Sequence, residues 1–237
     1  MVEYSIVLPA HNEEKRLGKA VAALLTSLGK KYDYEIIIAE DGSTDETYQL
    51  AKKIARNQRH KVRVIHSDEK LGRGRALCKT FNKAKGKYVA YMDVDLATDV
   101  EHVRELLRKI KNADIVVGSR YLKESRAKRT TKRLFFSSGF NLLARLLLGS
   151  KISDHQCGFK AFNKKAILPL CKQAKSTHWF WDTEILVLAQ KKGLSVEEFA
   201  IAWSEQPTTT INFKTDILDM GSGILRLWWK LATTSKK

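Results

Sequence analysis

The stretch Gly86-Lys87-Tyr88-Val89-Ala90-Tyr91-Met92-Asp93-Val94-Asp95 decides the fold of this chain. From Tyr88 to Met92 the only polar groups are tyrosine hydroxyls, which predicts a strand buried on both faces, as in a parallel sheet. Asp93 and Asp95 follow, and because side chains alternate along a strand, both carboxylates point the same way. At the carboxyl edge of an open α/β sheet, where ligands bind, such a pair suits Mg2+ or Mn2+ carrying substrate phosphates.

This strand is one of several that alternate with helix-like stretches along the chain. Strands are expected at Ser5–Leu8, Glu35–Ala39, Val62–His66, Tyr88–Met92 and Asp114–Gly118, and helices at Glu13–Ser27, Thr44–Asn57, Gly74–Ala84 and Val100–Lys111. The alternation predicts right-handed βαβ units, and therefore an α/β fold with a mostly parallel sheet flanked by helices. A helix that starts near Asp99 leaves an alternative for the two aspartates, which is to cap it.

Composition limits the class of protein. The 237 residues fit one domain with a sizeable core, and the formal charge of +17 implies anionic partners: nucleic acid, an acidic membrane surface or phosphorylated substrates. We expect no signal peptide and no transmembrane helix, because no run of about 18 apolar residues occurs. Cys78, Cys157 and Cys171 are odd in number and lack metal-ligand spacing, which fits reduced thiols in a cytosol.

The pattern changes after Gly118. Lys123–Arg133 is crowded with basic residues, and the apolar run Leu134–Leu148 that follows is too short and too polar to span a bilayer. Two readings stay open for this run: a helix lying in a membrane interface, or an ordinary core-facing helix after a solvated basic loop. Further on we expect a helix at Trp179–Lys192 and a strand at Ser195–Trp203.

The last stretch, Ile217–Leu231, is expected to form an amphipathic helix. Its apolar stripe is predicted to hold Ile217, Ile224, Trp228 and Leu231. Trp228 and Trp229 next to Lys230 are typical of a lipid headgroup boundary, although a helix docked on the domain explains the pattern equally well.

Four short segments fall at strand ends in the first half. They are Leu8-Pro9-Ala10-His11-Asn12-Glu13-Glu14, Glu40-Asp41-Gly42-Ser43-Thr44-Asp45, Lys70-Leu71-Gly72-Arg73-Gly74-Arg75-Ala76 and the Asp93/Asp95 pair. In this order and spacing they resemble the nucleotide-sugar site of the inverting family 2 glycosyltransferases, which have a GT-A fold. Gly72 and Gly74 let the backbone pass close to a phosphate, and the missing third glycine and Gly-Lys-Ser/Thr ending exclude dinucleotide and P-loop fingerprints. Asp41 could accept a hydrogen bond from a base edge, although Asp41-Gly42-Ser43 alone is more often a turn and helix cap.

Segments of the second half narrow the resemblance. Val117-Gly118-Ser119-Arg120-Tyr121, Arg133 with Ser137 and Asn141, and Asp154-His155-Gln156-Cys157-Gly158-Phe159-Lys160 resemble the polyprenyl-phosphate branch, which contains dolichyl-phosphate mannose synthases and glucosyltransferases. The resemblance implies three groups of site residues. The nucleotide sugar is held by Pro9, His11, Glu13, Ala39, Asp41, Gly72, Met92, Asp93, Val94 and Asp95; the metal by Asp93 and Asp95; and the lipid phosphate by Arg120, Arg133 and Ser137. Asp93, Asp95, Arg120 and Arg133 are the expected catalytic residues of a single glycosyltransferase domain, with a nucleotide-sugar half at 1–120, an acceptor half at 121–215 and a C-terminal amphipathic helix at 216–237.

The chain also departs from this branch. Mannose synthases usually carry a tyrosine where His11 stands and a metal-binding glutamine where Ala97 stands, and their late loop has basic residues that are missing between Glu205 and Ile211. Ala202-Trp203-Ser204-Glu205 is more similar to the glucosyltransferase type. The donor therefore stays open among GDP-mannose, UDP-glucose and UDP-N-acetylglucosamine.

The expected reaction transfers the sugar to a polyprenyl or dolichyl phosphate at the cytoplasmic face of a membrane, to which the protein binds peripherally. Whether a separate membrane subunit anchors it stays open. One rival is transfer to a sugar hydroxyl, which needs a general base such as Asp154, Asp182 or Glu184. A second rival, a nucleic-acid binder, rests on charge alone and leaves the paired carboxylates unexplained, so we expect no nucleic-acid partner.

Overall fold

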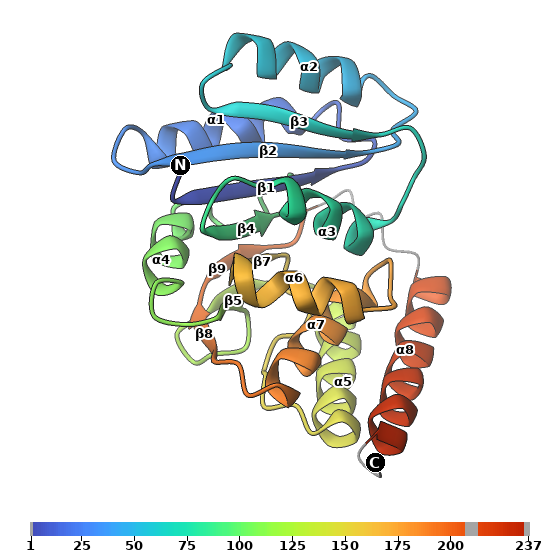
Figure 1. Cartoon of the computed structure of the whole chain (residues 1–237). Coiled ribbons are helices and arrows are strands. Elements are labelled where there is room, and N and C mark those ends of the chain that lie inside the picture. The colour runs from blue at the N-terminus through green and yellow to red at the C-terminus, as the bar shows by residue number, and fades with distance from the viewer. Residues whose placement is uncertain (1, 207–212, 235–237) are drawn as a thin grey trace.

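A seven-stranded mixed sheet forms the centre of the molecule (Figure 1). The computed structural model describes residues 2–206 and 213–234. In spatial order the sheet contains β3 (Val62–Ser67), β2 (Tyr34–Asp41), β1 (Tyr4–Ala10), β4 (Tyr88–Met92), β7 (Phe159–Asn163), β5 (Ile115–Ser119) and β8 (Val196–Ala200). All five residues of β4 are buried, as expected for a strand covered on both faces. The α/β fold with a mostly parallel sheet is confirmed.

One strand of the sheet, β7, was not predicted. It lies between β4 and β5 and runs antiparallel to both, with Met92 opposite Phe159 and Tyr88 opposite Asn163. Sequence order suggests that β4 and β5 are neighbours, because consecutive strands of βαβ units are often adjacent. The inserted strand instead comes from the second half of the chain.

Helices cover both faces of the sheet (Figure 1). On one face α1 (Leu17–Leu28) contacts α2 (Thr47–Asn57) and α4 (His102–Lys109), and on the other α3 (Arg73–Lys83) contacts α6 (Lys164–Gln173) and α7 (Phe180–Lys191). The main hydrophobic core lies between these layers and the sheet. The four helices predicted in the first half are confirmed, with ends that differ by a few residues.

The segment predicted as one strand at Ser195–Trp203 forms two. β8 pairs with β5, whereas β9 (Ala202–Ser204) pairs with β6 (Arg126–Lys128) in a separate two-stranded sheet. The buried Ile201 separates them. This break carries Trp203 away from the main sheet and toward the segment that follows Asp95, where Trp203 forms an isolated bridge with Thr98.

A second, smaller core joins α7 to α5 (Thr131–Leu148) and α8 (Phe213–Thr234), which lie side by side (Figure 1). It contains Phe140, Ala144, Leu148, Phe180, Val187, Ile224 and Leu227. The predicted stripe on α8 is confirmed at Ile224 and wrong at Trp228, which is 44% exposed because Leu227 takes the inward position. The side chain of Ile217 lies outside the described residues.

The outer faces of α5 and α8 are apolar and exposed. The exposed side chains are Leu134, Phe135, Phe136, Leu142, Leu143, Leu146 and Leu147 on α5 and Leu218, Leu225, Trp228 and Trp229 on α8, and we call them the apolar face. A core-facing helix explains the buried stripe of α5 but does not explain why these side chains are exposed. Across residues 2–206 and 213–234, no helix combines the length and hydropathy required to cross a bilayer.

A disulfide joins α3 to α6. Cys78 and Cys171 are 93 positions apart in sequence, and their Cα atoms lie 5.6 Å apart. The prediction of three reduced thiols is therefore wrong for these two, because the packing of α3 against α6 brings together cysteines whose spacing gives no sign of it. Cys157 is free and buried, and burial raises the pKa of its thiol to about 12.

Candidate active site

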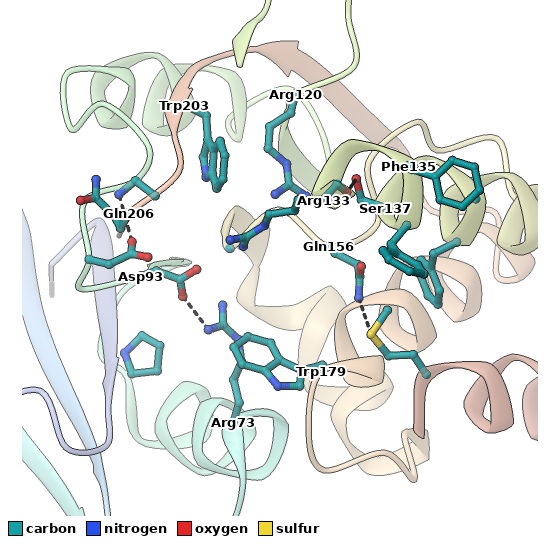
Figure 2. Close-up of a pocket in the computed structure, with 18 of the residues that line it drawn as sticks. Arg73, Asp93, Arg120, Arg133, Phe135, Ser137, Gln156, Trp179, Trp203 and Gln206 are labelled. Atoms are coloured by element: carbon teal, nitrogen blue, oxygen red, sulfur yellow. Dashed lines mark hydrogen bonds and ion pairs between the residues drawn. The ribbon is translucent and has the colours of Figure 1, made fainter. Parts of the chain in front are cut away.

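A cavity of about 420 Å3 opens at the carboxyl edge of β1 and β4 (Figure 2). Its polar wall is formed by Glu13, Arg16, Arg73, Asp93, Asp95, Arg120 and Arg133, and its apolar wall by Phe135, Phe136, Phe140, Leu143, Met220 and Ile224. The structure therefore brings together paired acids from the first half of the chain and arginines from the second. The apolar wall belongs to α5 and α8.

Asp93 and Asp95 both face this cavity, and neither caps α4. Asp95 accepts a hydrogen bond from the amide of Ala97 (2.9 Å), whereas the cap of the following turn is Asp99, whose carboxylate accepts from the amide of Glu101 (3.0 Å). Burial and the neighbouring charge of Asp93 raise the pKa of Asp95. The capping alternative is therefore wrong, and the two carboxylates remain together at the edge of the sheet.

Arg73 forms an ion pair with Asp93 that sequence reasoning missed. Its Nη1 donates to Oδ1 of Asp93 at 2.5 Å (Figure 2). Its Nε lies 3.7 Å from the carboxylate of Asp182. The guanidinium lies over the rings of Tyr91 and Trp179, at 5.2 and 5.3 Å. Burial alone would lower the pKa of Arg73, but the carboxylates of Asp93 and Asp182 outweigh it and raise that pKa. The arginine is thus fully charged at the floor of the cavity.

The backbone of Gly158 lies against the same carboxylate. A Cβ at this position would lie 1.9 Å from Oδ2 of Asp93 and 2.9 Å from Nη2 of Arg73, and the amide of Asp93 donates to the carbonyl of Gly158 (3.2 Å). Only a residue without a side chain fits here. The glycine immediately before β7 therefore limits how Asp93 is placed.

A buried lysine completes a chain of alternating charges beneath the cavity. Lys160 is 1% exposed, and its Nζ donates to Asp182 (2.7 Å) and to the carbonyl of Cys157 (2.5 Å). The hydroxyl of Tyr91 also donates to Asp182. In the order Lys160, Asp182, Arg73, Asp93 each charge has an opposite partner. For the buried Lys160 and Asp182, such pairing is the condition for tolerating a charge in a protein interior.

The residues expected to hold the nucleotide sugar fall into two groups. Pro9, Glu13, Asp93, Val94 and Asp95 line the cavity, whereas His11, Ala39, Asp41, Gly72 and Met92 do not. Burial raises the pKa of Glu13, against the effect of its ion pair with Arg16 at 2.6 Å.

Asp41 holds a loop in the structure. Its carboxylate accepts hydrogen bonds from the amides of Leu71 (2.8 Å) and Gly72 (3.0 Å), and His11 Nδ1 lies 2.9 Å from its carbonyl. Gly72 has a φ of +88°, a conformation that favours glycine. The loop after β3 is thus fixed beside the ends of β1 and β2, and contact of Asp41 with a base stays a prediction.

Arg120 is paired with Asp154. Its Nε and Nη2 donate to the two carboxylate oxygens at 2.7 and 2.8 Å, and Asp154 is completely buried. Burial would raise the pKa of Asp154, but the guanidinium outweighs it and lowers the pKa. A bidentate pair of this kind fixes the plane of the arginine at the wall of the cavity.

Arg133, from the first turns of α5, points into the same space as Arg120 (Figure 2). Its Nη1 lies 3.3 Å from Glu205, and its guanidinium carbon lies over the ring of Trp203, 5.2 Å from the centroid. One turn later Ser137 accepts a hydrogen bond from the hydroxyl of Tyr121 (2.7 Å) and donates to the carbonyl of Arg133 (2.7 Å). All three predicted acceptor residues line the cavity.

His155 joins α5 to the segment before β7. Its Nδ1 lies 2.8 Å from Oδ1 of Asn141, and its Nε2 lies 2.8 Å from the hydroxyl of Ser150. Burial lowers the pKa of this histidine to about 4, so the ring is neutral near pH 7. It holds the helix that carries Arg133 and Ser137, a role that the sequence did not reveal.

The three acids proposed as general bases for a hydroxyl acceptor lie outside the cavity wall. Asp154 is paired with Arg120, Asp182 with Lys160, and Glu184 accepts from the amides of Lys175 and Ser176 (3.0 and 2.8 Å). All three are at most 3% exposed. None of them is placed to take a proton from a group bound in the cavity.

Asp93 and Asp95 fit a divalent cation as a pair of oxygen ligands. In the part of the chain that the structure describes, no group of three or more His, Cys, Asp or Glu side chains could hold a metal by itself. A hard cation that keeps water and phosphate oxygens in its shell, as Mg2+ does, matches a site with two carboxylates and open space beside them.

Comparison with known proteins agrees with this geometry. Residues 5–168 match the family model described as glycosyl transferase family 2. Glycosyltransferase AglD of Haloferax volcanii is 43% identical over 235 residues, which is 97% of this chain and 38% of AglD. The dolichyl-phosphate beta-glucosyltransferases of Saccharomyces cerevisiae and Homo sapiens are 31% and 30% identical, over 93% and 99% of this chain and 72% and 79% of their own lengths.

Solved structures share the fold. Glucosyl-3-phosphoglycerate synthase from Mycobacterium tuberculosis, in complex with uridine diphosphate, has a TM-score of 0.72 at 19% identity, covering 96% of this chain and 80% of that one. Its complex with Mn2+, uridine diphosphate and glucosyl-3-phosphoglycerate has a TM-score of 0.69, also at 19% identity, covering 94% and 77%. At this identity the likeness shows a common GT-A-like architecture.

Proposed function

The chain belongs to glycosyl transferase family 2, and from this membership we propose that it transfers a sugar, glucose first among the candidates, from a nucleotide sugar to a polyprenyl or dolichyl phosphate. It is a glycosyltransferase close to AglD and to the dolichyl-phosphate beta-glucosyltransferases. The names of these relatives support the lipid phosphate and the glucosyl donor. The Ala202-Trp203-Ser204-Glu205 segment supports the same choice.

The observation that carries the proposal is the composition of one cavity. Paired carboxylates, the arginines Arg120 and Arg133 and an apolar wall made by α5 and α8 meet in a single space of about 420 Å3. An acceptor with a phosphate at one end and a hydrocarbon chain at the other matches the last two features. A sugar acceptor would require polar groups where Phe135, Phe140 and Leu143 stand.

Asp93 and Asp95 would hold a Mg2+ or Mn2+ ion, which neutralises the diphosphate of the donor when it is bound. The Mn2+ complex of glucosyl-3-phosphoglycerate synthase, a protein of the same fold, supports a divalent ion. Arg73 supplies a further positive charge beside Asp93, at the floor of the cavity.

The arginines make the approach of two anions possible. An alkyl phosphate has a second pKa of about 6, so at neutral pH it is mostly a dianion and a competent nucleophile that needs no general base. Like charges at about 4 Å repel by roughly 4 kcal/mol at an effective dielectric of 20. Arg120 and Arg133 offset this repulsion by binding the incoming phosphate.

In the proposed reaction, one bond to the anomeric carbon forms as another breaks. A phosphate oxygen attacks the anomeric carbon while the bond from that carbon to the donor diphosphate breaks, and the electron pair leaves with the nucleoside diphosphate. In-line attack inverts the anomeric carbon and converts an α-linked donor into a β-linked lipid phosphate sugar. In the described chain Asp154, Asp182 and Glu184 do not line the cavity, which is compatible with this route. The acids that do line it are Glu13, which is paired with Arg16, and Asp93 and Asp95, which are proposed to hold the metal.

The apolar face is proposed to lie on the membrane that holds the acceptor. It is continuous with the cavity through Phe135, Phe136 and Leu143, which belong to both. Exposed basic residues of the same region, Arg126, Lys128 and Lys132, add attraction to anionic lipid, about 1 kcal/mol for each charge near the surface.

The test is a donor screen with the purified protein. UDP-glucose, GDP-mannose and UDP-N-acetylglucosamine are each incubated with a polyprenyl phosphate in detergent, with and without Mn2+, and both the nucleoside diphosphate and the lipid-linked sugar are measured. We expect equal amounts of both products with UDP-glucose. Asp95→Asn should reduce turnover about 100-fold or more, while Glu101→Gln, which changes a surface carboxylate paired with Arg104, should not. Release of nucleoside diphosphate with no lipid-linked sugar for any donor would overturn the proposal.

A further inference from the structure

Trp203 is the contact that the two acceptor arginines share. Its ring centroid lies 5.3 Å from the guanidinium carbon of Arg120 and 5.2 Å from that of Arg133 (Figure 2). Trp203 is 7% exposed and lines the cavity. The three residues come from separate parts of the fold: Arg120 follows β5, Arg133 belongs to α5 and Trp203 to β9.

The two arginines differ in how the rest of the protein holds them. Arg120 is 8% exposed and has a bidentate pair with the buried Asp154. Arg133 is 21% exposed, and its ion pair with Glu205 is longer, at 3.3 Å, between two partly exposed groups. The contact with the Trp203 ring is therefore expected to contribute more to the position of Arg133 than to that of Arg120.

An aromatic ring is suited to hold an arginine that must also bind phosphate. A carboxylate neutralises the guanidinium and occupies its N–H groups, whereas a ring attracts the cation through its face. The donors of a guanidinium lie in its own plane, so a ring over its face occupies none of them. In Arg120 the pair with Asp154 uses Nε and Nη2, and in Arg133 the pair with Glu205 uses Nη1. Trp203 thus orients positive charge without cancelling it.

The strand that carries Trp203 is also tied to the segment after Asp95. The amide of Ser204 donates to the carbonyl of Ala97 (2.8 Å), and the amide of Asp99 donates to the carbonyl of Ala202 (3.1 Å). Asp95 in turn accepts from the amide of Ala97 (2.9 Å). Only short backbone links separate the tryptophan from the carboxylate pair.

We propose that Trp203 is a positioning residue: its ring sets Arg120 and Arg133 as one phosphate-binding unit and fixes the distance of that unit from Asp93 and Asp95. This inference rests on the proposed function. Arg73 lies on Trp179 in a similar way, at 5.3 Å, on the other side of the cavity. Trp179 therefore provides a matched comparison on the side of Asp93.

The experiment compares Trp203→Leu, Trp203→Phe and Trp179→Leu with the wild-type protein. Binding of n-octyl phosphate, a water-soluble alkyl phosphate, is measured by calorimetry, and transfer kinetics are measured with the donor and acceptor concentrations varied separately. For Trp203→Leu we expect octyl phosphate affinity to fall tenfold or more and the acceptor KM to rise by a similar factor, with the donor KM within twofold of the wild type. Trp203→Phe, which keeps an aromatic face, should recover most of both losses.

Trp179→Leu is expected to give the opposite split, with a raised donor KM and near wild-type octyl phosphate affinity. Melting temperatures identify a variant that fails to fold. If Trp203→Leu does not fold, the comparison of Trp203→Phe with the wild type still measures how octyl phosphate affinity and acceptor KM depend on the size of the ring. The inference is overturned if Trp203→Leu binds octyl phosphate as the wild type does, or if Phe restores nothing. If the wild type neither binds octyl phosphate nor transfers sugar to a lipid phosphate, the proposed function itself fails.

Discussion

At the scale of single residues, the cavity is built from charges that meet in opposite pairs and from rings that hold arginines. Arg73 lies between Asp93 and Asp182 and over two aromatic rings, and Arg120 lies between Asp154 and Trp203. Each of these contacts limits the orientation of a guanidinium. Side chains held in this way lose little freedom when a ligand arrives, which favours both affinity and catalysis.

Arg133 is expected to act on the acceptor alone. Arg133→Ala should lower kcat/KM for the lipid phosphate about 10- to 100-fold, because a hydrogen bond to a charged group contributes roughly 1.5–3 kcal/mol, and it should leave the donor KM unchanged. Arg133→Lys should recover only part of the loss, since lysine lacks the planar fork. Steady-state kinetics in detergent measure both constants, with Arg126→Ala, an exposed arginine on β6, as the control. An equal rise of the donor KM would refute the assignment.

Gly158→Ala should disable the carboxylate pair while the fold persists. The added methyl would lie 1.9 Å from Oδ2 of Asp93, so the carboxylate or Arg73 must move. A displacement of about 1 Å at a reacting centre can cost about 100-fold in rate. Turnover and the melting temperature are measured together. Gly18→Ala on α1, where an added Cβ meets nothing within 4 Å, is the matched control and should retain activity. Wild-type turnover in Gly158→Ala would contradict this role.

The sequence was sufficient to predict the site residues that directly follow a strand, because the end of a strand is a local signal. Asp93 and Asp95 follow a buried run, and the structure places them together in the cavity. Arg73 was noticed only for the glycines beside it, because its partners Asp182 and Trp179 are more than 100 positions away. The segment of Trp203 was noticed, but its contact with Arg120 and Arg133 was not predicted, for the same reason. Contacts between distant segments leave no local pattern that spacing could reveal.

At the scale of secondary structure, periodicity was sufficient for the first half of the fold and insufficient for the second. The predicted strands and helices up to Gly118 correspond to β1–β5 and α1–α4. Beyond that point β6, β7 and α6 were not predicted, because β6 has three residues and Phe159–Asn163 alternates too little to be distinguished from a loop. The helix at Lys164–Gln173 even contains Pro169, a residue that normally argues against a helix.

The helices α5 and α8 are expected to carry the membrane contact. Replacing Leu146 and Trp229, which are 70% and 66% exposed, with serine removes apolar surface that would insert into lipid. Each full side chain of this kind is worth roughly 1.5–3 kcal/mol on transfer from water, so the double variant should bind anionic vesicles at least tenfold more weakly. Vesicle sedimentation gives the bound fraction.

Transfer to n-octyl phosphate should survive this double substitution, because neither residue lines the cavity. Gln49→Ser on α2, which covers the other end of the sheet, is the control and should leave vesicle binding unchanged (Figure 1). If the double variant sediments with vesicles as the wild type does, the apolar face contacts something other than a bilayer.

At the scale of the whole molecule, the Cys78–Cys171 disulfide ties together two helices from opposite halves of the chain. Opening a loop this long should destabilise the protein by about 2–5 kcal/mol, because the unfolded chain gains conformational freedom. The midpoint of urea unfolding is therefore expected to fall on reduction and to fall similarly in Cys78→Ser/Cys171→Ser. Reductant should not affect that double variant further, and an unchanged midpoint in the reduced wild type would contradict the bridge.

Strand β7 has a consequence for how such a protein can be recombined. A strand that runs antiparallel to its neighbours brings the residues before it, rather than those after it, to the edge where β4 ends. Gly158 therefore reaches Asp93 from the far half of the chain. The proposed donor-binding part and the proposed acceptor-binding part of the chain are therefore joined through one strand, β7. A chimera of two relatives should fold only when β7 and its neighbouring strands come from the same parent. Acceptor specificity is therefore expected to be exchangeable by replacing α5 and β9, but not by joining the first half of one chain to the second half of another.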